Sequence, residues 1–164
     1  MIYRPSGKIE TALDLGGKLD PIRTEQLAVG RFALESKRSY ANELVTIRER
    51  KLVSNDVGLH IGSMVSFDNR SPTAADLNLL VFGDSFFEYR PHLLTGMFAD
   101  TVRKFTFVWS TSIDWSIVAE LKPDILLTEC AERFMTTLPG DTMNVAEHVR
   151  RKLAPLNLAN QLAP

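Results

Sequence analysis

Three short apolar runs, each followed by polar turn residues, dominate the second half of the chain. They are residues 79–82, 105–109 and 125–129, and helix-length segments separate them. Each run is too short for a buried helix and is rich in Leu, Ile, Val and Phe, which is typical of strands buried on both faces. Strands that alternate with helices form parallel sheets through right-handed crossovers. The pattern therefore predicts an α/β fold in which three parallel strands end at one edge of a sheet.

Helices are expected between and after these strands. The segments predicted to be helical are residues 91–102, 114–121 and 141–154, and residues 155–164 are expected to form a tail. Proline is tolerated in the first turn of a helix, which suits Pro91 as a start. A spacing of three and four residues predicts which side chains of the first helix face the sheet. These are Leu94, Met97, Phe98 and Thr101.

The first 67 residues lack this alternation. Prolines and glycines scattered through residues 1–37 predict an extended arm or loop. Residues 38–67 hold two apolar runs on either side of the turn residues Ser54-Asn55-Asp56, and the second run alternates with period two. This pattern predicts an antiparallel β-hairpin. We therefore expect one domain, residues 1–164, with the hairpin appended to a βαβαβ core over residues 77–139.

Composition narrows the function classes. Nineteen Lys and Arg against twenty Asp and Glu give a formal net charge of −1, without the basic surplus that nucleic-acid binding needs. The lone cysteine, Cys130, cannot form an internal disulfide or a cysteine-based zinc site. No apolar stretch approaches the ~20 residues that span a bilayer. We expect no nucleic-acid partner and no membrane segment in this chain, and the compartment is left undetermined.

The first of the three strands stops at Gly83-Asp84-Ser85, followed by Phe86. Glycine permits a tight turn, which would lift Ser85 out of the sheet just before a helix. In open α/β sheets ligands bind at this edge, and N–H groups there stabilise a developing negative charge. These residues are candidates for a nucleophile, Ser85, and for oxyanion or substrate binding. The alternative is an ordinary turn with a helix cap, because Asp and Ser favour both.

Polar residues also follow the other two strands and would meet Ser85 at the same edge. Ser110 follows the second strand, and Glu132 and Arg133 follow the third. Arg133 would bind an anion or stabilise an oxyanion, or would instead form a structural ion pair with Glu132. Cys130 follows an apolar strand and is expected to be an inert, buried thiol.

A nucleophilic serine needs a base, and the chain offers three histidines. His92 lies seven residues after Ser85 and is a weak candidate, either pointing back toward the turn or facing solvent. We expect His60 on the solvent face of the hairpin and His148 on an exposed helix. The sequence contains no phosphate-binding loop, metal-ligand cluster or dinucleotide fingerprint, so no cofactor and no metal are predicted.

The stretch from Leu79 to Pro139 resembles a known family. The segments Leu80-Val81-Phe82-Gly83-Asp84-Ser85-Phe86, Lys122 to Glu129 and Glu132-Arg133-Phe134 are similar to the SGNH-hydrolase-like domain of alginate O-acetyltransferases and related polysaccharide-modifying proteins. Residues 14–19 are similar to a segment that precedes the serine in that family. The resemblance implies a three-layer, flavodoxin-like parallel sheet of the SGNH type with Ser85 as nucleophile.

In that family an Asp-x-His pair ahead of the Asp-Leu-Gly segment activates the serine, and Asp56 and His60 do not match it. The resemblance therefore implies a serine O-acetyltransferase or acetylesterase acting on a polysaccharide, either truncated or inactive. Its implied partners are a polysaccharide or an acetylated small-molecule ester, and an export or acetylation machinery. Its implied location is periplasmic or exported. The alternatives are a non-catalytic glycan-binding or assembly module, and an interaction domain if Phe86, Phe87 and Tyr89 form an exposed patch.

Overall fold

A computed structural model describes residues 2–11, 20–53, 58–91, 93–134 and 140–156. The chain divides into two compact units, Met1–Leu34 and Glu35–Pro164, and each is described by itself. Among the described residues, no helix is long and apolar enough to cross a membrane.

The first unit is a pair of antiparallel strands where the sequence predicted an arm or loop. Strand β1 (Ile2–Thr11) pairs with β2 (Glu25–Ala33), and the register shifts between Pro5 and Gly7. Proline lacks an N–H group, so it is tolerated at a bulge or on an edge strand. Both strands of a two-stranded sheet are edge strands. The prolines and glycines that indicated a loop are therefore compatible with pairing here.

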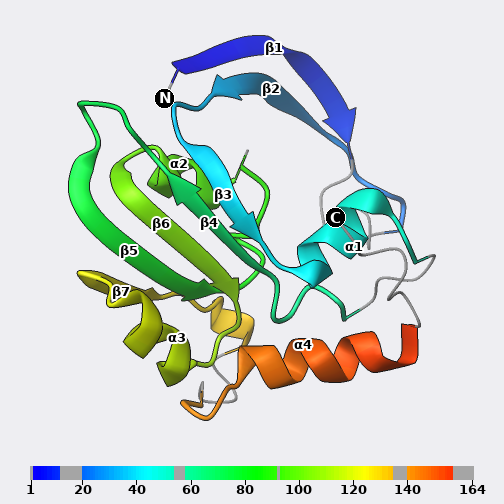
Figure 1. Ribbon diagram of the computed structural model, residues 1–164. Coiled ribbons are helices and arrows are strands. Elements are labelled where there is room, and N and C mark those ends of the chain that lie inside the picture. The colour runs from blue at the N-terminus through cyan, green and yellow to red at the C-terminus, as the bar shows by residue number, and fades with distance from the viewer. Residues whose placement is uncertain (1, 12–19, 54–57, 92, 135–139, 157–164) are drawn as a thin grey trace. The chain divides into compact units, whose positions relative to one another are not determined.

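The second unit is built on a five-stranded sheet in the order β3-β4-β6-β5-β7 (Figure 1). The strands are β3 (Lys37–Ala41), β4 (Met64–Asp68), β5 (Ala75–Gly83), β6 (Val102–Trp109) and β7 (Ile125–Thr128). Strand β5 pairs in parallel with both β6 and β7, which confirms the three predicted parallel strands. Strand β4 is antiparallel to β3 and to β6, so it alone runs against the other four. The sheet is therefore mixed, and the carboxyl ends of four strands meet at one edge.

The predicted hairpin is wrong in its first run. Residues Glu43–Arg50 form helix α1, and the antiparallel pair is β3 with β4. Buried Asn42 caps α1, accepting from the N–H groups of Val45 (3.4 Å) and Met64 (3.2 Å), while its Nδ2 donates to Gly62 O (2.8 Å). An Asn before an apolar run is a helix-start signal. The second run is shorter than predicted, because residues 58–62 form a turn with left-handed glycines at 58 and 62.

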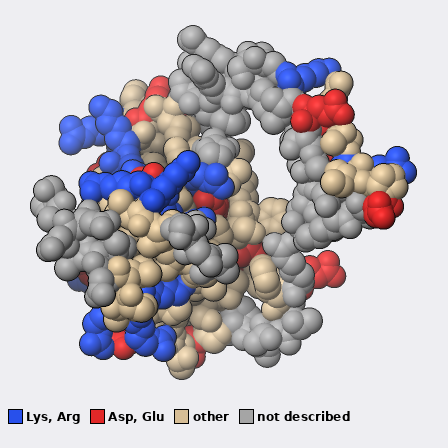
Figure 2. Space-filling model, turned by 90° about the vertical axis from the view of Figure 1, so that its right-hand side faces the viewer, with Lys and Arg blue, Asp and Glu red and all other residues tan. Residues whose placement is uncertain are grey.

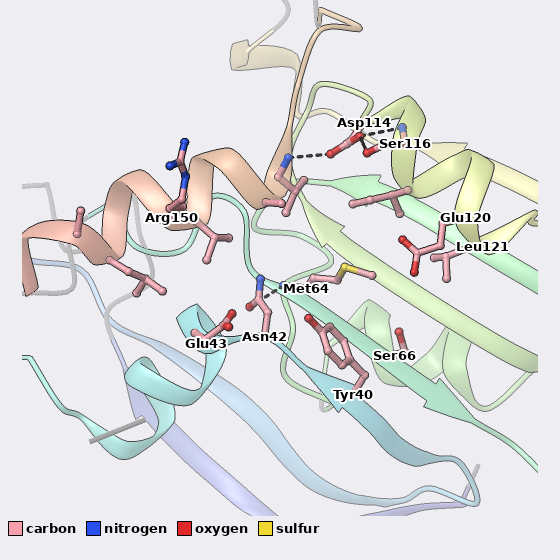
Figure 3. Close-up of a pocket in the computed structure, with 16 residues that line it drawn as sticks. Tyr40, Asn42, Glu43, Met64, Ser66, Asp114, Ser116, Glu120, Leu121 and Arg150 are labelled. Atoms are coloured by element: carbon pink, nitrogen blue, oxygen red, sulfur yellow. Dashed lines mark hydrogen bonds between the residues drawn. The ribbon is translucent and has the colours of Figure 1, made fainter. Parts of the chain in front are cut away.

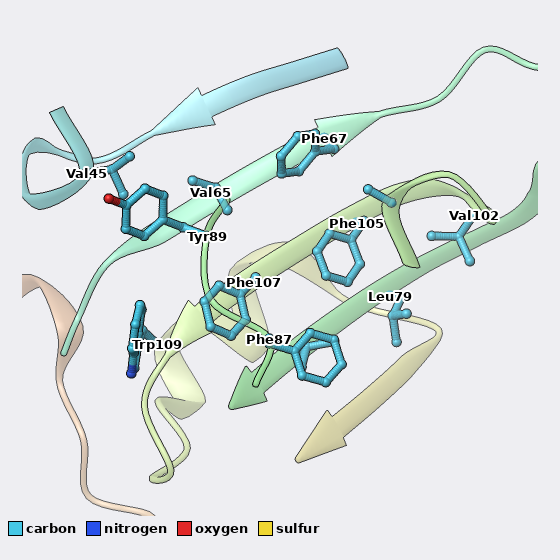
Figure 4. Packing of buried hydrophobic residues seen from close by; sticks show 12 residues of the cluster. Val45, Val65, Phe67, Leu79, Phe87, Tyr89, Val102, Phe105, Phe107 and Trp109 are labelled. Atoms are coloured by element: carbon cyan, nitrogen blue, oxygen red, sulfur yellow. The ribbon is translucent and has the colours of Figure 1, made fainter. Parts of the chain in front are cut away.

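Side chains alternate along β5 between two apolar clusters, which explains its continuous apolar sequence. Leu79 and Val81 belong to one cluster, and Leu80 and Phe82 to the other. Figure 4 shows the first cluster, in which aromatic rings cover one face of the sheet. Its members are Val45, Val65, Phe67, Leu79, Val81, Phe87, Tyr89, Ala99, Val102, Phe105, Phe107 and Trp109. The second consists of Leu44, Ile47, Leu59, Leu80, Phe82, Val108, Ile117, Val145 and Val149.

Helices cover both faces. Helix α2 (Leu94–Ala99) contributes Ala99 to the first cluster, while α3 (Trp115–Leu121) and α4 (Val145–Leu153) contribute to the second. Helix α2 is shorter than the predicted 91–102, since β6 begins at Val102, and Met97 and Thr101 are exposed although predicted to face the sheet. Helix α4 begins after its cap, Asn144, within the predicted 141–154. Of the predicted tail, Pro155 and Leu156 lie in the short 3₁₀ helix η3 (Ala154–Leu156). The rest of the tail lies outside the described residues.

Candidate functional site

The turn after β5 is held by the side chain of Asp84. This carboxylate is buried and accepts hydrogen bonds from the N–H groups of Phe86 (2.9 Å) and Ala131 (2.8 Å). The first bond closes the turn around Ser85, and the second ties it to the segment that follows β7. Asp84 therefore has a structural role that joins two strand ends at the edge predicted to carry the site.

A second carboxylate, that of Glu129 at the end of β7, lies against the same turn. Its Oε2 accepts from the Asp84 N–H at 2.9 Å, and its own N–H donates to Phe82 O at 2.8 Å. Burial, and after it the neighbouring Asp84 carboxylate, raises the pKa of Glu129 in spite of the Asp84 N–H bond. A Cβ placed on Gly83 would come within 3.0 Å of Glu129 Oε2. A side chain at 83 would therefore crowd this carboxylate, which would have to shift by a few tenths of an ångström.

Ser85 stands between two anchored residues. Ser85 and Phe86 are exposed, with Phe86 at 58%. The next residue, Phe87, is buried and its ring stacks on Phe107 at 5.9 Å between centroids. Asp84, which precedes Ser85, and Phe87, two residues after it, are both held in place. Ser85 therefore lies at the surface on a constrained turn. Phe87 and Tyr89 are both buried, so the exposed patch of Phe86, Phe87 and Tyr89 that would favour an interaction domain is not present.

Glu88 is a buried carboxylate in the loop that follows. Its backbone is left-handed, with φ of 51°, and its carbonyl accepts from Thr95 Oγ1. Its Oε2 pairs with Arg90, whereas Oε1 is buried with no hydrogen-bond partner among the described residues. Residue 92, the predicted base, lies outside the described residues.

A histidine that the sequence placed toward solvent reaches the same sheet edge. The half-buried His60 packs its ring on Trp109 with 4.8 Å between centroids. Trp109 ends β6 and is the register partner of Gly83 in β5. The guanidinium of Arg48 lies over the rings of both Tyr89 and Trp109, 5.2 Å from the Tyr89 centroid and 5.7 Å from the Trp109 centroid. Gly58 and Gly62, which flank His60 in the sequence, were the available signal that His60 is not part of a regular strand.

His148 was predicted to be exposed on a helix, but its side chain is half-buried. Its Nε2 atom is buried and has no hydrogen-bond partner among the described residues. Burial and then the charges of Lys152 and Arg151 lower the pKa of His148, which favours a neutral ring. His148 belongs to α4, which is distant in sequence from the segment that carries Ser85.

The remaining predicted site residues differ in how they are used. Ser110 is buried, and its hydroxyl donates to Ser112 O (2.7 Å) and accepts from Ser112 N (3.0 Å). Both of these hydrogen bonds of the Ser110 hydroxyl lie within the turn. A contact between Ser110 and a substrate stays a prediction. Glu132 is exposed at the start of the 3₁₀ helix η2 (Glu132–Phe134), and the side chain of Arg133 lies outside the described part. Burial and the charges of Asp84 and Glu129 raise the pKa of Cys130, which disfavours a reactive thiolate.

Asp114, after β6, joins two helices. It caps α3, accepting from Ser116 N (2.9 Å) and Ser116 Oγ, and its other oxygen accepts from Val145 N (2.7 Å) at the start of α4. Burial alone would raise the pKa of Asp114, but these hydrogen bonds outweigh it and lower that pKa. The carboxylate is therefore charged and structural.

A cavity of about 1050 Å³ opens elsewhere in the second unit, and none of the predicted site residues lines it. Among the described residues, no group of three or more His, Cys, Asp and Glu side chains could hold a metal ion. Figure 2 shows Lys and Arg in several separate groups with Asp and Glu among them, as a net charge near zero implies.

No family model matches the chain, and no curated protein matches it. Among solved structures it resembles Bacillus cereus PatB1, with a TM-score of 0.44 and 10% identity over 80% of this chain and 48% of that chain. A structure of PatB1 with a sulfonyl adduct gives a TM-score of 0.34 and 10% identity over 42% of this chain and 23% of that chain. The chain thus spans less than half the length of the PatB1 chains. Similarity of this extent gives no residue-by-residue correspondence with PatB1.

Proposed function

We propose that this chain is an SGNH-like, three-layer α/β domain that moves an acetyl group to or from a polysaccharide hydroxyl through Ser85. The observation that carries the proposal is the turn itself. Ser85 is exposed just after β5, an interior strand with a parallel neighbour on each side, on a turn constrained by buried Asp84 and Phe87. A nucleophile requires this combination of access and fixed position.

In the proposed reaction, Ser85 Oγ attacks the carbonyl carbon of an acetyl ester while its proton passes to a histidine base. The bond to the donor alcohol breaks, the base returns the proton to that alcohol, and the acetyl group stays on Ser85. A glycan hydroxyl or water then attacks the acetyl-serine, gives its proton to the base and releases Ser85. The acceptor decides between transfer and hydrolysis.

We assign the base to His92, with His60 as the alternative because its ring lies at the carboxyl end of β6, beside β5. Glu88, whose buried Oε1 has no described partner, is the candidate in this loop for the carboxylate that orients the base. We assign the oxyanion contact to the Ser85 N–H together with a neighbouring donor.

The test is serine-directed labelling with a fluorophosphonate, together with hydrolysis of p-nitrophenyl acetate. We expect Ser85→Ala to abolish labelling and to lower the rate about a hundredfold or more. Ser39→Ala, an exposed serine on β3, is the matched control and should retain both. Equal labelling of the Ser85→Ala protein and the unchanged chain would remove Ser85 as the nucleophile.

The exposed Phe86 ring beside Ser85 favours one second candidate, a non-catalytic glycan-binding or assembly module. Such a module would bind the polysaccharide with an affinity that survives Ser85→Ala, and no labelling would occur. The same pair of proteins therefore distinguishes the two functions.

A further inference from the structure

Two carboxyl groups meet at the turn that carries Ser85, although two carboxylates would repel each other. Glu129 Oε2 accepts from the Asp84 N–H at 2.9 Å, and the side chains of Glu129 and Asp84 are also hydrogen-bonded to each other. A hydrogen bond between two carboxyl groups requires that one of them carries a proton. The pair therefore holds one proton and one negative charge next to the proposed nucleophile.

The hydrogen bonds of Asp84 indicate which member of the pair is ionised. Its Oδ1 accepts from the Phe86 N–H at 2.9 Å and its Oδ2 from the Ala131 N–H at 2.8 Å, and the side chain is buried. An ionised carboxylate accepts through both oxygens, whereas a carboxylic acid donates through one of them. Asp84 is therefore the charged member, and the proton lies on Glu129.

The surroundings of Glu129 also favour its neutral form. Burial, and after it the Asp84 carboxylate, raises the pKa of Glu129, and no Lys or Arg in the described part of the chain contributes to this shift. A further titratable neighbour is the thiol of Cys130, whose pKa is raised by burial and then by Asp84 and Glu129. The pair thus keeps its proton at pH values at which an exposed glutamic acid has lost it.

Asp114 is a buried carboxyl group of the opposite kind. It accepts from Ser116 and from the Val145 N–H, as the dashed lines in Figure 3 show. Burial alone would raise the pKa of Asp114, but these hydrogen bonds lower it. Burial therefore does not decide the charge of a carboxyl group in this unit. The charge depends on whether N–H donors or a second carboxylate face the group.

We propose that Glu129 is a positioning residue that keeps the Ser85 turn in its reactive form by holding the proton shared with Asp84. With the proton in place, the pair joins β7 to the turn and carries a single negative charge. Without it, two carboxylates repel each other across this junction and add a second negative charge near the oxyanion that forms at Ser85. The inference rests on the function proposed for Ser85, and it gives that site a pH-dependent control.

The test compares Glu129→Gln with Glu129→Ala in a Cys130→Ser parent chain, which lacks the neighbouring thiol. Glutamine donates to Asp84 as the protonated acid does, and it cannot lose that proton. We expect Glu129→Ala to slow fluorophosphonate labelling of Ser85 about tenfold, and Glu129→Gln to preserve the rate at about pH 5. The ratio of the Glu129→Gln rate to the parent rate should then rise with pH, by up to about tenfold per unit.

This ratio cancels the titration of the histidine base, which both proteins share. Glu120→Gln removes an exposed glutamate that lines the large cavity (Figure 3), and it is the matched control whose ratio should stay constant. A constant ratio for Glu129→Gln as well, or a Glu129→Ala variant that is labelled as fast as the parent chain, would overturn the proposal.

A second measurement does not depend on Ser85. Because the pKa of Glu129 is raised on folding, stability should fall as the pH rises from the unfolded value of about 4.3 through the folded value. Glu129→Gln does not titrate, so its urea midpoint should rise relative to that of the parent chain across this window and then level off. A midpoint difference that does not change with pH would show that the pair holds no proton, and would overturn the proposal even if Ser85 is the nucleophile. Labelling that survives Ser85→Ala would reject the proposed function and this inference together, and the urea series distinguishes that result from the absence of a shared proton.

Discussion

At the scale of single residues, the site depends on how little space surrounds Gly83. Glu129 Oε2 occupies the place that a side chain at 83 would need, and it is held there by the Asp84 N–H. The carboxylate cannot move by a few tenths of an ångström without weakening that bond. The small size of Gly83 thus leaves room for the hydrogen bond between Glu129 and the residue that precedes Ser85.

Gly83→Ala should therefore destabilise the turn by about 1 kcal/mol, the worth of one hydrogen bond, and reduce any Ser85-dependent activity. Urea unfolding and fluorophosphonate labelling measure the two effects. Glu129→Ala removes the obstructing oxygen, so the double variant should lose less than the sum of the single variants. Strict additivity would show that the contact between residues 83 and 129 is not the cause.

At the scale of elements, the order of the second unit depends on polar side chains that link the end of one element to the start of another. Asn42 joins α1 to β4, Asp84 joins the β5 turn to the segment after β7, and Asp114 joins α3 to α4. Each is buried and each accepts N–H groups that a helix or turn leaves without partners. These residues set the relative positions of elements that the apolar clusters alone would hold loosely.

Replacing Asp114 should destabilise the second unit by about 1–3 kcal/mol, because Asp114→Ala removes a helix cap and the bond to Val145 N. The pKa of Asp114 is lowered in the folded chain, so its contribution is complete above the unfolded value of about 4 and is lost as pH falls through the folded value. The stability difference from Asp114→Asn should accordingly shrink below about pH 4. Denaturant unfolding at several pH values measures this, with Asp76→Asn, whose side chain is 94% exposed, as control. A difference that is the same at pH 3 and pH 7 would contradict the charged role.

At the scale of the whole molecule, the second unit contains its own core. Among the residues whose side chains the structure describes, every member of the two apolar clusters lies between Ala41 and Leu156, including the partly buried side chains packed against them. The first unit is a two-stranded sheet, an arrangement that is marginally stable in isolation.

Residues 35–164 should therefore fold without residues 1–34. We expect cooperative thermal unfolding with a midpoint within a few degrees of that of the full chain, since neither cluster loses a described member. Circular dichroism in the far and near ultraviolet measures this. A non-cooperative transition, or loss of the near-ultraviolet signal of the aromatic cluster, would show that the first unit is needed for packing.

The sequence by itself determined the parallel part of the sheet and the place of Ser85. The runs at 79–82 and 105–109 are buried on both faces, so their composition alone distinguishes them as strands, and Ser85 follows the first of them by local turn chemistry. The run at 125–129 forms an edge strand that is only partly buried, with Ile125 45% exposed, and its apolar residues between turns predicted it. Helix α3 was also predicted from local sequence, because the segment from Asp114 to Leu121 has the length of a short helix and begins with a capping residue.

Only the tertiary structure decided the elements whose local signals were ambiguous and the contacts between distant residues. The run around Leu44 and Ile47 is compatible with a strand or a helix, and packing against both clusters selects α1. Strand β1 contains Pro5, which in the sequence indicates a loop. Only the pairing of β1 with β2 shows that this segment is a strand. Glu129 reaches Gly83, and Asp84 accepts from Ala131 N, across intervals of sequence that no periodicity spans. Periodicity reports which face of an element is buried, whereas the contacts that build a site depend on which elements become neighbours.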